Sequence, residues 1–212
     1  MTEPLNHDLT EYQLLCIAVG SLFLNWADFE GGLTAGLKLH LLAQFKSVNK
    51  AESNKAARMV AAIYGSQRMK AARDTMKRLA SVEDIEPKRV RFAEAVFAHI
   101  GNIETLRDKL AHQSLVETPE DHVWRLHDIM TTRALMEPKL YEIKTQALYH
   151  AAADVKLAGL RLSGLLDKRS LAGRFDLTPP TWQYKASMLK PLPKSKLLPP
   201  RSPLRLPKQS GK

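Results

Sequence analysis

The residues best suited to chemistry are Arg107, Asp108 and His112, which lie in the last six positions of a long helical pattern. Histidine takes up and returns a proton near neutral pH, and arginine binds a phosphate through two parallel hydrogen bonds. Asp108 and His112 are four residues apart, so in a helix the carboxylate can bond to the imidazole and fix its tautomer. Together these side chains could perform chemistry that needs no metal.

Arg107 lies within the apolar face of that helix. With 100° of rotation per residue, this face is expected to pack in a core. Its apolar members are Val96, Ile103, Leu106 and Leu110. An unpaired buried guanidinium is costly, so Arg107 must meet a carboxylate, open onto a pocket or lie at a subunit contact. His112 is five residues after Arg107, so the two side chains point about 140° apart around the helix axis. The two side chains therefore converge only if the arginine reaches round the helix end, or if a second copy of the chain completes the site.

Each of these residues also has a simpler interpretation. Glu30, on an earlier helical pattern, is a candidate partner for Arg107, but an ordinary exposed acid is the more economical interpretation. His112 could simply interact with the last carbonyl groups of its own helix. Arg107 could pair with an acid across a purely structural dimer interface, with no chemistry at all.

The other candidate sites are weaker. His122 and His127 do not have the spacing of a standard zinc site. Ser114 lacks the glycine pattern of a hydrolase nucleophile. The chain has no glycine-rich loop of the kind that cradles phosphates. We therefore expect no metal site and no cofactor.

The motif Arg-Asp-Lys-Leu-Ala-His, at the end of a helix and followed by a short extended segment, resembles the HEPN domain family. The resemblance covers approximately residues 8–168. HEPN domains are small all-helical nucleotide-binding and ribonuclease modules of prokaryotic defence and toxin systems. Some toxin members have a tyrosine two residues after the histidine. This chain has Ser114 at that position, which places the chemistry of that subfamily in doubt.

The resemblance implies a metal-independent endoribonuclease of a phage-defence or toxin–antitoxin system, in which the 2′-hydroxyl of the substrate attacks its own phosphate. Arg107, Asp108 and His112 would be the catalytic residues, and two copies of the motif would face each other across a homodimer cleft. The alternative is a non-catalytic HEPN-like module that binds nucleotide, RNA or protein.

The surrounding pattern predicts an all-α, up-and-down bundle of four to five helices. The helical stretches are residues 8–45, 50–81, 87–113 and 138–166. The glycines at 31, 32 and 36 suggest a bend or a close helix contact in the first stretch. Residues 114–116 and 122–129 flank a turn sequence and could form a small hairpin.

The chain is expected to consist of a HEPN-like bundle over residues 1–168 and a tail over residues 169–212. From Lys168 onwards there are 11 Lys/Arg, one acid (Asp176) and eight of the 12 prolines, while the charges of the remainder cancel. Such a composition predicts a disordered or polyproline-like arm from about residue 178. The arm could bind RNA phosphates, or it could solubilise the protein or dock a protein partner such as an antitoxin.

The predicted location is the cytoplasm. A single cysteine, Cys16, excludes an internal disulfide and fits a reducing compartment. The apolar run from Leu14 to Leu24 is too short to span a bilayer and follows acidic rather than basic residues. We therefore expect a core helix there, and no membrane partner.

Overall fold

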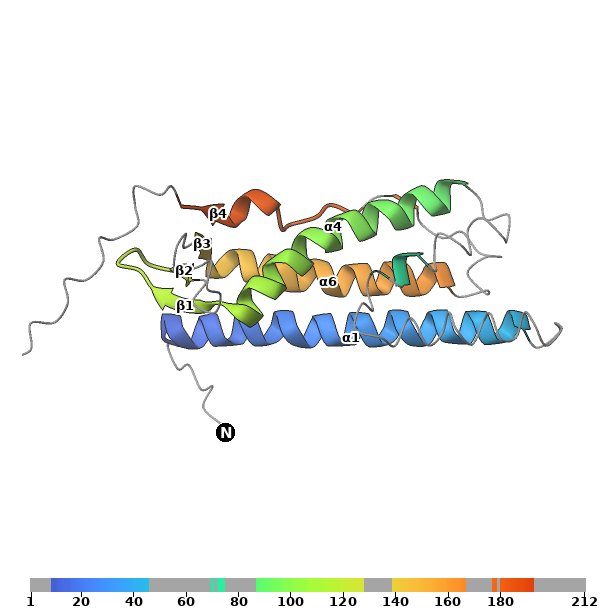
Figure 1. The fold of residues 1–212 in the computed structure, drawn as a ribbon, viewed down its shortest axis with the longest axis horizontal. Coiled ribbons are helices and arrows are strands. Elements are labelled where there is room, and N and C mark those ends of the chain that lie inside the picture. The colour runs from blue at the N-terminus through green and yellow to red at the C-terminus, as the bar shows by residue number, and fades with distance from the viewer. Residues whose placement is uncertain are drawn as a thin grey trace, which may run out of the picture.

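The computed structural model describes residues 9–45, 70, 72–74, 87–127, 139–166, 177–178 and 180–192. Its long helices are α1 (Glu11–Phe45), α4 (Pro87–His112) and α6 (Thr145–Leu166). The strands are β1 (Ser114–Glu117), β2 (Val123–His127), β3 (Leu140–Lys144) and β4 (Lys190–Pro191), and a 3-10 turn, η1, covers Ala186–Met188. The helices lie side by side, and the sheet covers the end at which α1 begins and α4 ends (Figure 1).

Helix α1 begins where its sequence provides a capping box. The Gln13 backbone N–H donates to Thr10 Oγ1 at 3.2 Å, and the Thr10 backbone N–H donates to Gln13 Oε1 at 2.8 Å. This reciprocal pair satisfies donors that the first helical turn leaves free. The helix then continues through Gly31, Gly32 and Gly36. A Cβ added at Gly31 or Gly32 would meet nothing within 4 Å, so these two glycines do not mark a close helix contact.

Helices α1 and α6 run in the same direction and form the main helical contact (Figure 1). The Tyr149 hydroxyl donates to the Leu14 carbonyl at 3.2 Å, and Asn25 Nδ2 donates to the Ala152 carbonyl at 2.9 Å. The core between α1, α4 and α6 is apolar. It includes Leu22, Trp26, Phe29, Ile100, Ile103, Leu106, Leu148, Val155 and Leu162. The segment Glu11–Leu37 is also long and apolar enough to cross a membrane, a property that core helices of soluble proteins share.

The sheet is antiparallel, with strand order β1-β2-β3-β4. The predicted hairpin is confirmed: Leu115 pairs with Leu126 and Glu117 with Trp124. At the end of β3 the Trp124 indole donates to Thr145 Oγ1 at 3.0 Å, which fixes the junction between the sheet and α6.

The prediction of an all-α bundle is wrong, because β3 and β4 extend the hairpin to a four-stranded sheet. The fourth helix was expected from residue 138, but it begins at Thr145, and residues 140–144 form β3. Leu140 and Ile143 have a spacing that also suits a helix. Pairing of β3 with β2 on one side and β4 on the other overrides that local pattern. The expected helical stretch at 50–81 lies mostly outside the described residues.

The predicted disorder of the tail does not hold for residues 180–192. Tyr184 is buried, and Glu142 in β3 pairs with Lys190 in β4. Burial raises the pKa of Tyr184 to about 12, so its phenol stays neutral. Proline at position 191 is tolerated because β4 is an edge strand.

Candidate active site at the end of helix α4

The apolar face of α4 packs as its period predicts. Its buried residues are Phe92, Ala93, Val96, Phe97, Ile100, Ile103 and Leu106. Arg107 lies at the border of this face, with 29% of its side chain exposed. The arginine is therefore partly buried, and its guanidinium needs partners.

Two groups engage the Arg107 guanidinium. Its Nε donates to Asp108 Oδ1 at 3.1 Å, and Nη2 contacts the same oxygen. Its central carbon also lies 5.1 Å from the centre of the Trp26 ring, a cation–π distance. The sequence left three environments open for Arg107: a carboxylate, a pocket or a subunit contact. A single copy of the chain provides the first of these, and the carboxylate is that of Asp108. Among the described residues, Glu30 forms no ion pair with Arg107.

His112 is exposed at the last position of α4. Within the described part of the chain, its imidazole has neither a hydrogen-bond nor an ion-pair partner. The Asp108 carboxylate, expected to orient this ring, faces Arg107 instead. A single chain therefore brings Arg107 and Asp108 together, and it leaves His112 apart from both.

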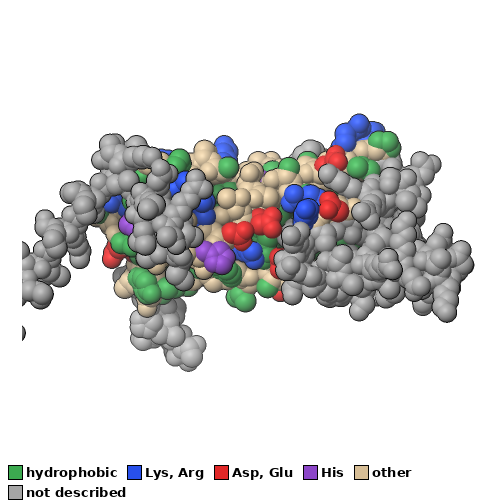
Figure 2. All heavy atoms as spheres, in the orientation of Figure 1, with side chains coloured by type: hydrophobic (Ala, Val, Ile, Leu, Met, Phe, Trp, Pro, Cys, Tyr) green, Lys and Arg blue, Asp and Glu red, His purple; other side chains and the backbone are tan. Residues whose placement is uncertain are grey.

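Further acidic and basic groups surround the arginine. Burial raises the pKa of the Glu104 carboxyl, and Asp108 raises it further, whereas Arg73 and Arg107 oppose the shift. Arg73 Nη2 lies 4.0 Å from Glu104 Oε2. Figure 2 shows acidic, basic and histidine side chains gathered on the face of the molecule that carries α4. The site is thus an exposed polar cluster above an apolar core.

Replacing Glu104 by glutamine should leave the protein as stable as the wild type or slightly more stable at pH 7, by about 0–0.5 kcal/mol. A raised pKa means that the folded state favours the protonated carboxyl, so the wild type loses stability relative to the variant as pH rises through the folded-state pKa. Urea unfolding of both proteins at acidic and neutral pH measures this. A variant that is clearly less stable at pH 7 would show that the ion pair with Arg73 outweighs burial.

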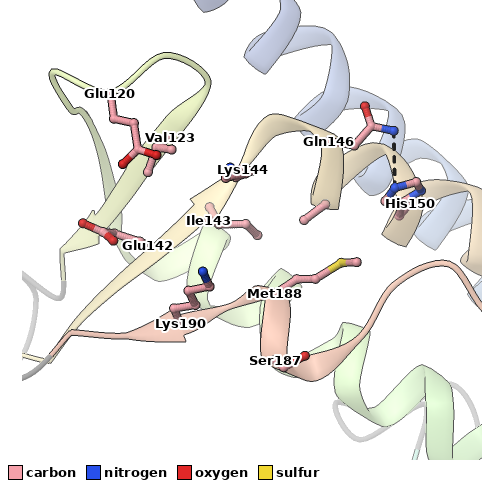
Figure 3. A pocket seen from close by; sticks show the side chains of 11 residues that line it. Glu120, Val123, Glu142, Ile143, Lys144, Gln146, His150, Ser187, Met188 and Lys190 are labelled. Atoms are coloured by element: carbon pink, nitrogen blue, oxygen red, sulfur yellow. Dashed lines mark hydrogen bonds between the residues drawn. The ribbon is translucent and has the colours of Figure 1, made fainter.

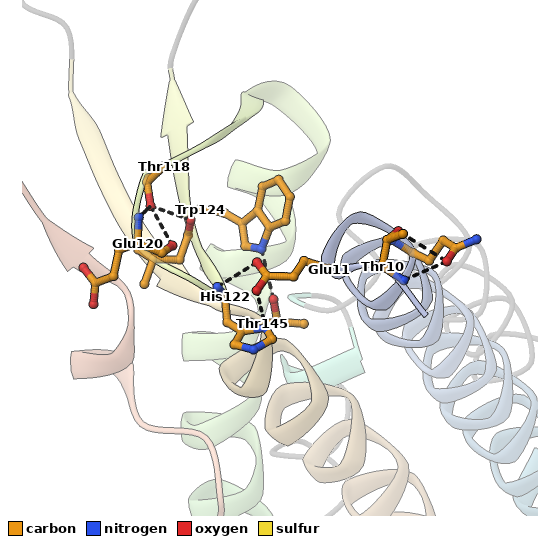
Figure 4. A network of polar contacts seen from close by, with 9 residues as sticks. Thr10, Glu11, Thr118, Glu120, His122, Trp124 and Thr145 are labelled. Carbon is orange, nitrogen blue, oxygen red and sulfur yellow. Dashed lines mark hydrogen bonds and ion pairs between the residues drawn. The ribbon is translucent and has the colours of Figure 1, made fainter. Parts of the chain in front are cut away.

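His122 and His127 both contact other parts of the fold. The His122 backbone N–H donates to Glu11 Oε2 at 2.9 Å, and His122 Nδ1 lies 3.5 Å from Glu11 Oε1 (Figure 4). His122 adopts a φ of 60° in the hairpin turn. Burial, and to a smaller extent Arg125, lowers the pKa of His127. No metal-binding group of His, Cys, Asp or Glu side chains exists within the described ranges. Ser114 is exposed in β1, where it pairs with His127.

Sequence reasoning missed a buried polar cluster between α4, α6 and residues 182–184. Asp154, 2% exposed, lies with Oδ2 2.9 Å from His99 Nε2 and accepts the Tyr184 backbone N–H at 2.8 Å. The His99 ring stacks on Trp182 with centroids 4.2 Å apart. The available signal was Asp154 itself, an acid within the apolar face of a strongly amphipathic helix.

No family model, curated protein or solved structure matches this chain.

Proposed function

We propose that this protein is a metal-independent endoribonuclease of the HEPN type, acting in the cytoplasm as part of a defence or toxin–antitoxin system. Its active site would be completed in a homodimer, with Arg107 from one copy and His112 from the other. The proposal applies the chemistry of the motif to the arrangement of side chains at the end of α4.

The observation that carries this proposal is that Asp108 and Trp26 engage Arg107, whereas the exposed His112 imidazole has no hydrogen-bond or ion-pair partner in the described part of the chain. The sequence left two ways to bring these side chains together. The arginine does not reach round the helix end, because it lies against Trp26 and Asp108. A second copy of the chain is the remaining way to supply the missing group, and both residues are accessible for it.

In the proposed reaction, His112 accepts the proton of the 2′-hydroxyl, whose oxygen attacks the adjacent phosphorus. The bond to the 5′-oxygen breaks, a protonated histidine returns a proton to that oxygen, and a 2′,3′-cyclic phosphate remains. Arg107 stabilises the charge that develops on the phosphate. Asp108 differs from the sequence expectation, since it positions the guanidinium rather than the imidazole.

A second candidate is the non-catalytic binding module. The hydrogen bonds between Arg107 and Asp108 favour it, because a guanidinium already paired with a carboxylate must exchange that partner before it can bind a phosphate. In this case the cluster would be an anchor for a nucleotide or protein partner, with no turnover.

The proposal is tested by incubating the purified chain with an end-labelled structured RNA in EDTA. We expect cleavage, products with 2′,3′-cyclic phosphate ends, and resistance of a DNA of the same sequence, which lacks the nucleophile. Binding of the RNA without cleavage would favour the second candidate. Cleavage that EDTA abolishes would contradict the metal-independent mechanism.

The C-terminal residues 193–212 are expected to increase RNA affinity. They contain six Lys/Arg and no Asp/Glu, whereas residues 180–192 belong to the fold and must be kept. Truncation after Leu192 should weaken RNA binding and reduce the slope of log affinity against log salt by about 0.7 for each phosphate that these residues neutralise. Fluorescence anisotropy at several salt concentrations measures this slope. An unchanged slope would contradict phosphate binding by this segment and leave its solubilising and protein-docking roles as the alternatives.

A further inference from the structure

A pocket of about 400 Å³ lies where the β1–β2 turn, β3, the first turns of α6 and the C-terminal segment meet. Its apolar wall consists of Val123, Ile143, Ala147 and Met188. Figure 3 shows charged and polar side chains from separate elements around it: Glu120 from the turn, Lys190 from β4, and Gln146 and His150 from α6. The volume lies in the range that small ligands occupy.

Among the described residues, the charges around the pocket are not all neutralised. Glu142 is held by Arg125, with Nε 3.1 Å from Oε1. Lys144 and Lys190 are exposed, and in the described part of the chain neither has a carboxylate partner. The Glu120 carboxylate is likewise unpaired within the described ranges. The pocket therefore offers two free cations and one free carboxylate.

His150 is a part of the wall that hydrogen bonds hold in place. Its Nδ1 lies 2.7 Å from Gln183 Oε1, and its Nε2 lies 3.3 Å from Gln146 Nε2. Lys144 and Lys190 are the lysine ammonium groups that a ligand meets in this pocket.

We propose that this pocket binds a guanine nucleotide. The two lysines suit a phosphate, and the apolar wall with the Met188 thioether suits the face of a base. A carboxylate only accepts hydrogen bonds, and the Watson–Crick edge of guanine presents two adjacent donors, N1–H and the N2 amino group. Adenine presents an acceptor at N1 instead, so the Glu120 carboxylate selects against it.

The nucleotide could be a residue of a bound RNA or a free nucleotide, since both present the same chemistry. The case in which the nucleotide is part of a bound RNA rests on the proposed function. In that case the pocket would bind a base of the substrate outside the site of the reacting phosphate, because neither Arg107 nor His112 lines it.

The test is calorimetric titration of the full chain with 5′-GMP and 5′-AMP. We expect GMP to bind at least about tenfold more tightly than AMP, and Glu120→Gln to remove most of that difference. The double variant Lys144→Ala/Lys190→Ala should weaken both nucleotides by about tenfold or more, because both share the phosphate. Glu117→Gln and Lys185→Ala are matched controls, since these exposed residues lie outside the pocket, and they should change neither affinity.

The proposal is overturned if GMP does not bind, if GMP and AMP bind equally, or if the pocket variants bind like the controls. Circular dichroism of each variant verifies that it has folded. Competition by an RNA that contains guanine, measured with the His112→Ala chain so that the RNA stays intact, would assign the site to RNA. If the RNA does not compete, the bound nucleotide does not come from RNA, and the ligand is a free nucleotide. Because GMP binding needs no turnover, a chain that binds GMP but cleaves no RNA would refute only the ribonuclease.

Discussion

Replacing His112 by alanine should lower the rate of RNA cleavage by about 10²–10⁴-fold, the usual contribution of a general acid–base group. Arg107→Ala should cause a loss of similar order, because an uncompensated charge would then develop on the phosphate. His112 is exposed and unpartnered in the described residues, so its replacement should leave folding intact. Initial rates on an end-labelled RNA in EDTA, with products mapped by their ends, measure both effects.

Mixing the two inactive variants tests the composite site directly. In a dimer of one His112→Ala chain and one Arg107→Ala chain, one of the two sites receives both replacements and the other receives neither. Random exchange of subunits should therefore restore about a quarter of the wild-type activity. A mixture that stays inactive, although exchange is demonstrated, would place both residues of each site in one chain. Equal activity of the wild type and both variants would assign the cleavage to a contaminant and favour the binding module.

The largest effect on stability is expected at Asp154. Its carboxylate is 2% exposed and accepts the backbone N–H groups of Gln183 and Tyr184 at 3.0 and 2.8 Å, in addition to its contact with His99. Asp154→Ala leaves these buried donors without an acceptor, which should cost about 3–5 kcal/mol. Asp154→Asn retains one acceptor oxygen, so about 1–3 kcal/mol is expected.

Urea unfolding of these two variants measures the loss, with Asp28→Ala as the matched control because Asp28 is an exposed acid on α1. The fluorescence of Trp182 provides a second measurement, since the indole stacks on His99 at 4.2 Å and should report release of the segment. A loss below about 1 kcal/mol in Asp154→Ala would contradict an anchoring role for this carboxylate.

Local sequence patterns identified several elements correctly. The apolar period of α4, with Pro87 in its first turn, predicted the helix and its buried face, and the turn sequence between β1 and β2 predicted the hairpin. These features depend on interactions within a few residues of each other, where helix period and turn chemistry are decisive. The pattern also predicted the Arg107 guanidinium within the apolar face, in need of a partner, and the structure places it at the border of that face with Asp108 as the partner.

Tertiary structure decided the remaining features, because each depends on residues that are distant in the chain. Residues 140–144 form a strand since β2 and β4 lie on either side of them, and residues 180–192 are ordered since Asp154 and His99 hold them. Helix packing also brings the Trp26 ring of α1 to the Arg107 guanidinium, whose carboxylate partner is the adjacent Asp108 rather than Glu30. The sequence by itself determined which groups are available at the end of α4. Packing determined which of them meet, because the free energy of burying a charge depends on every element around it.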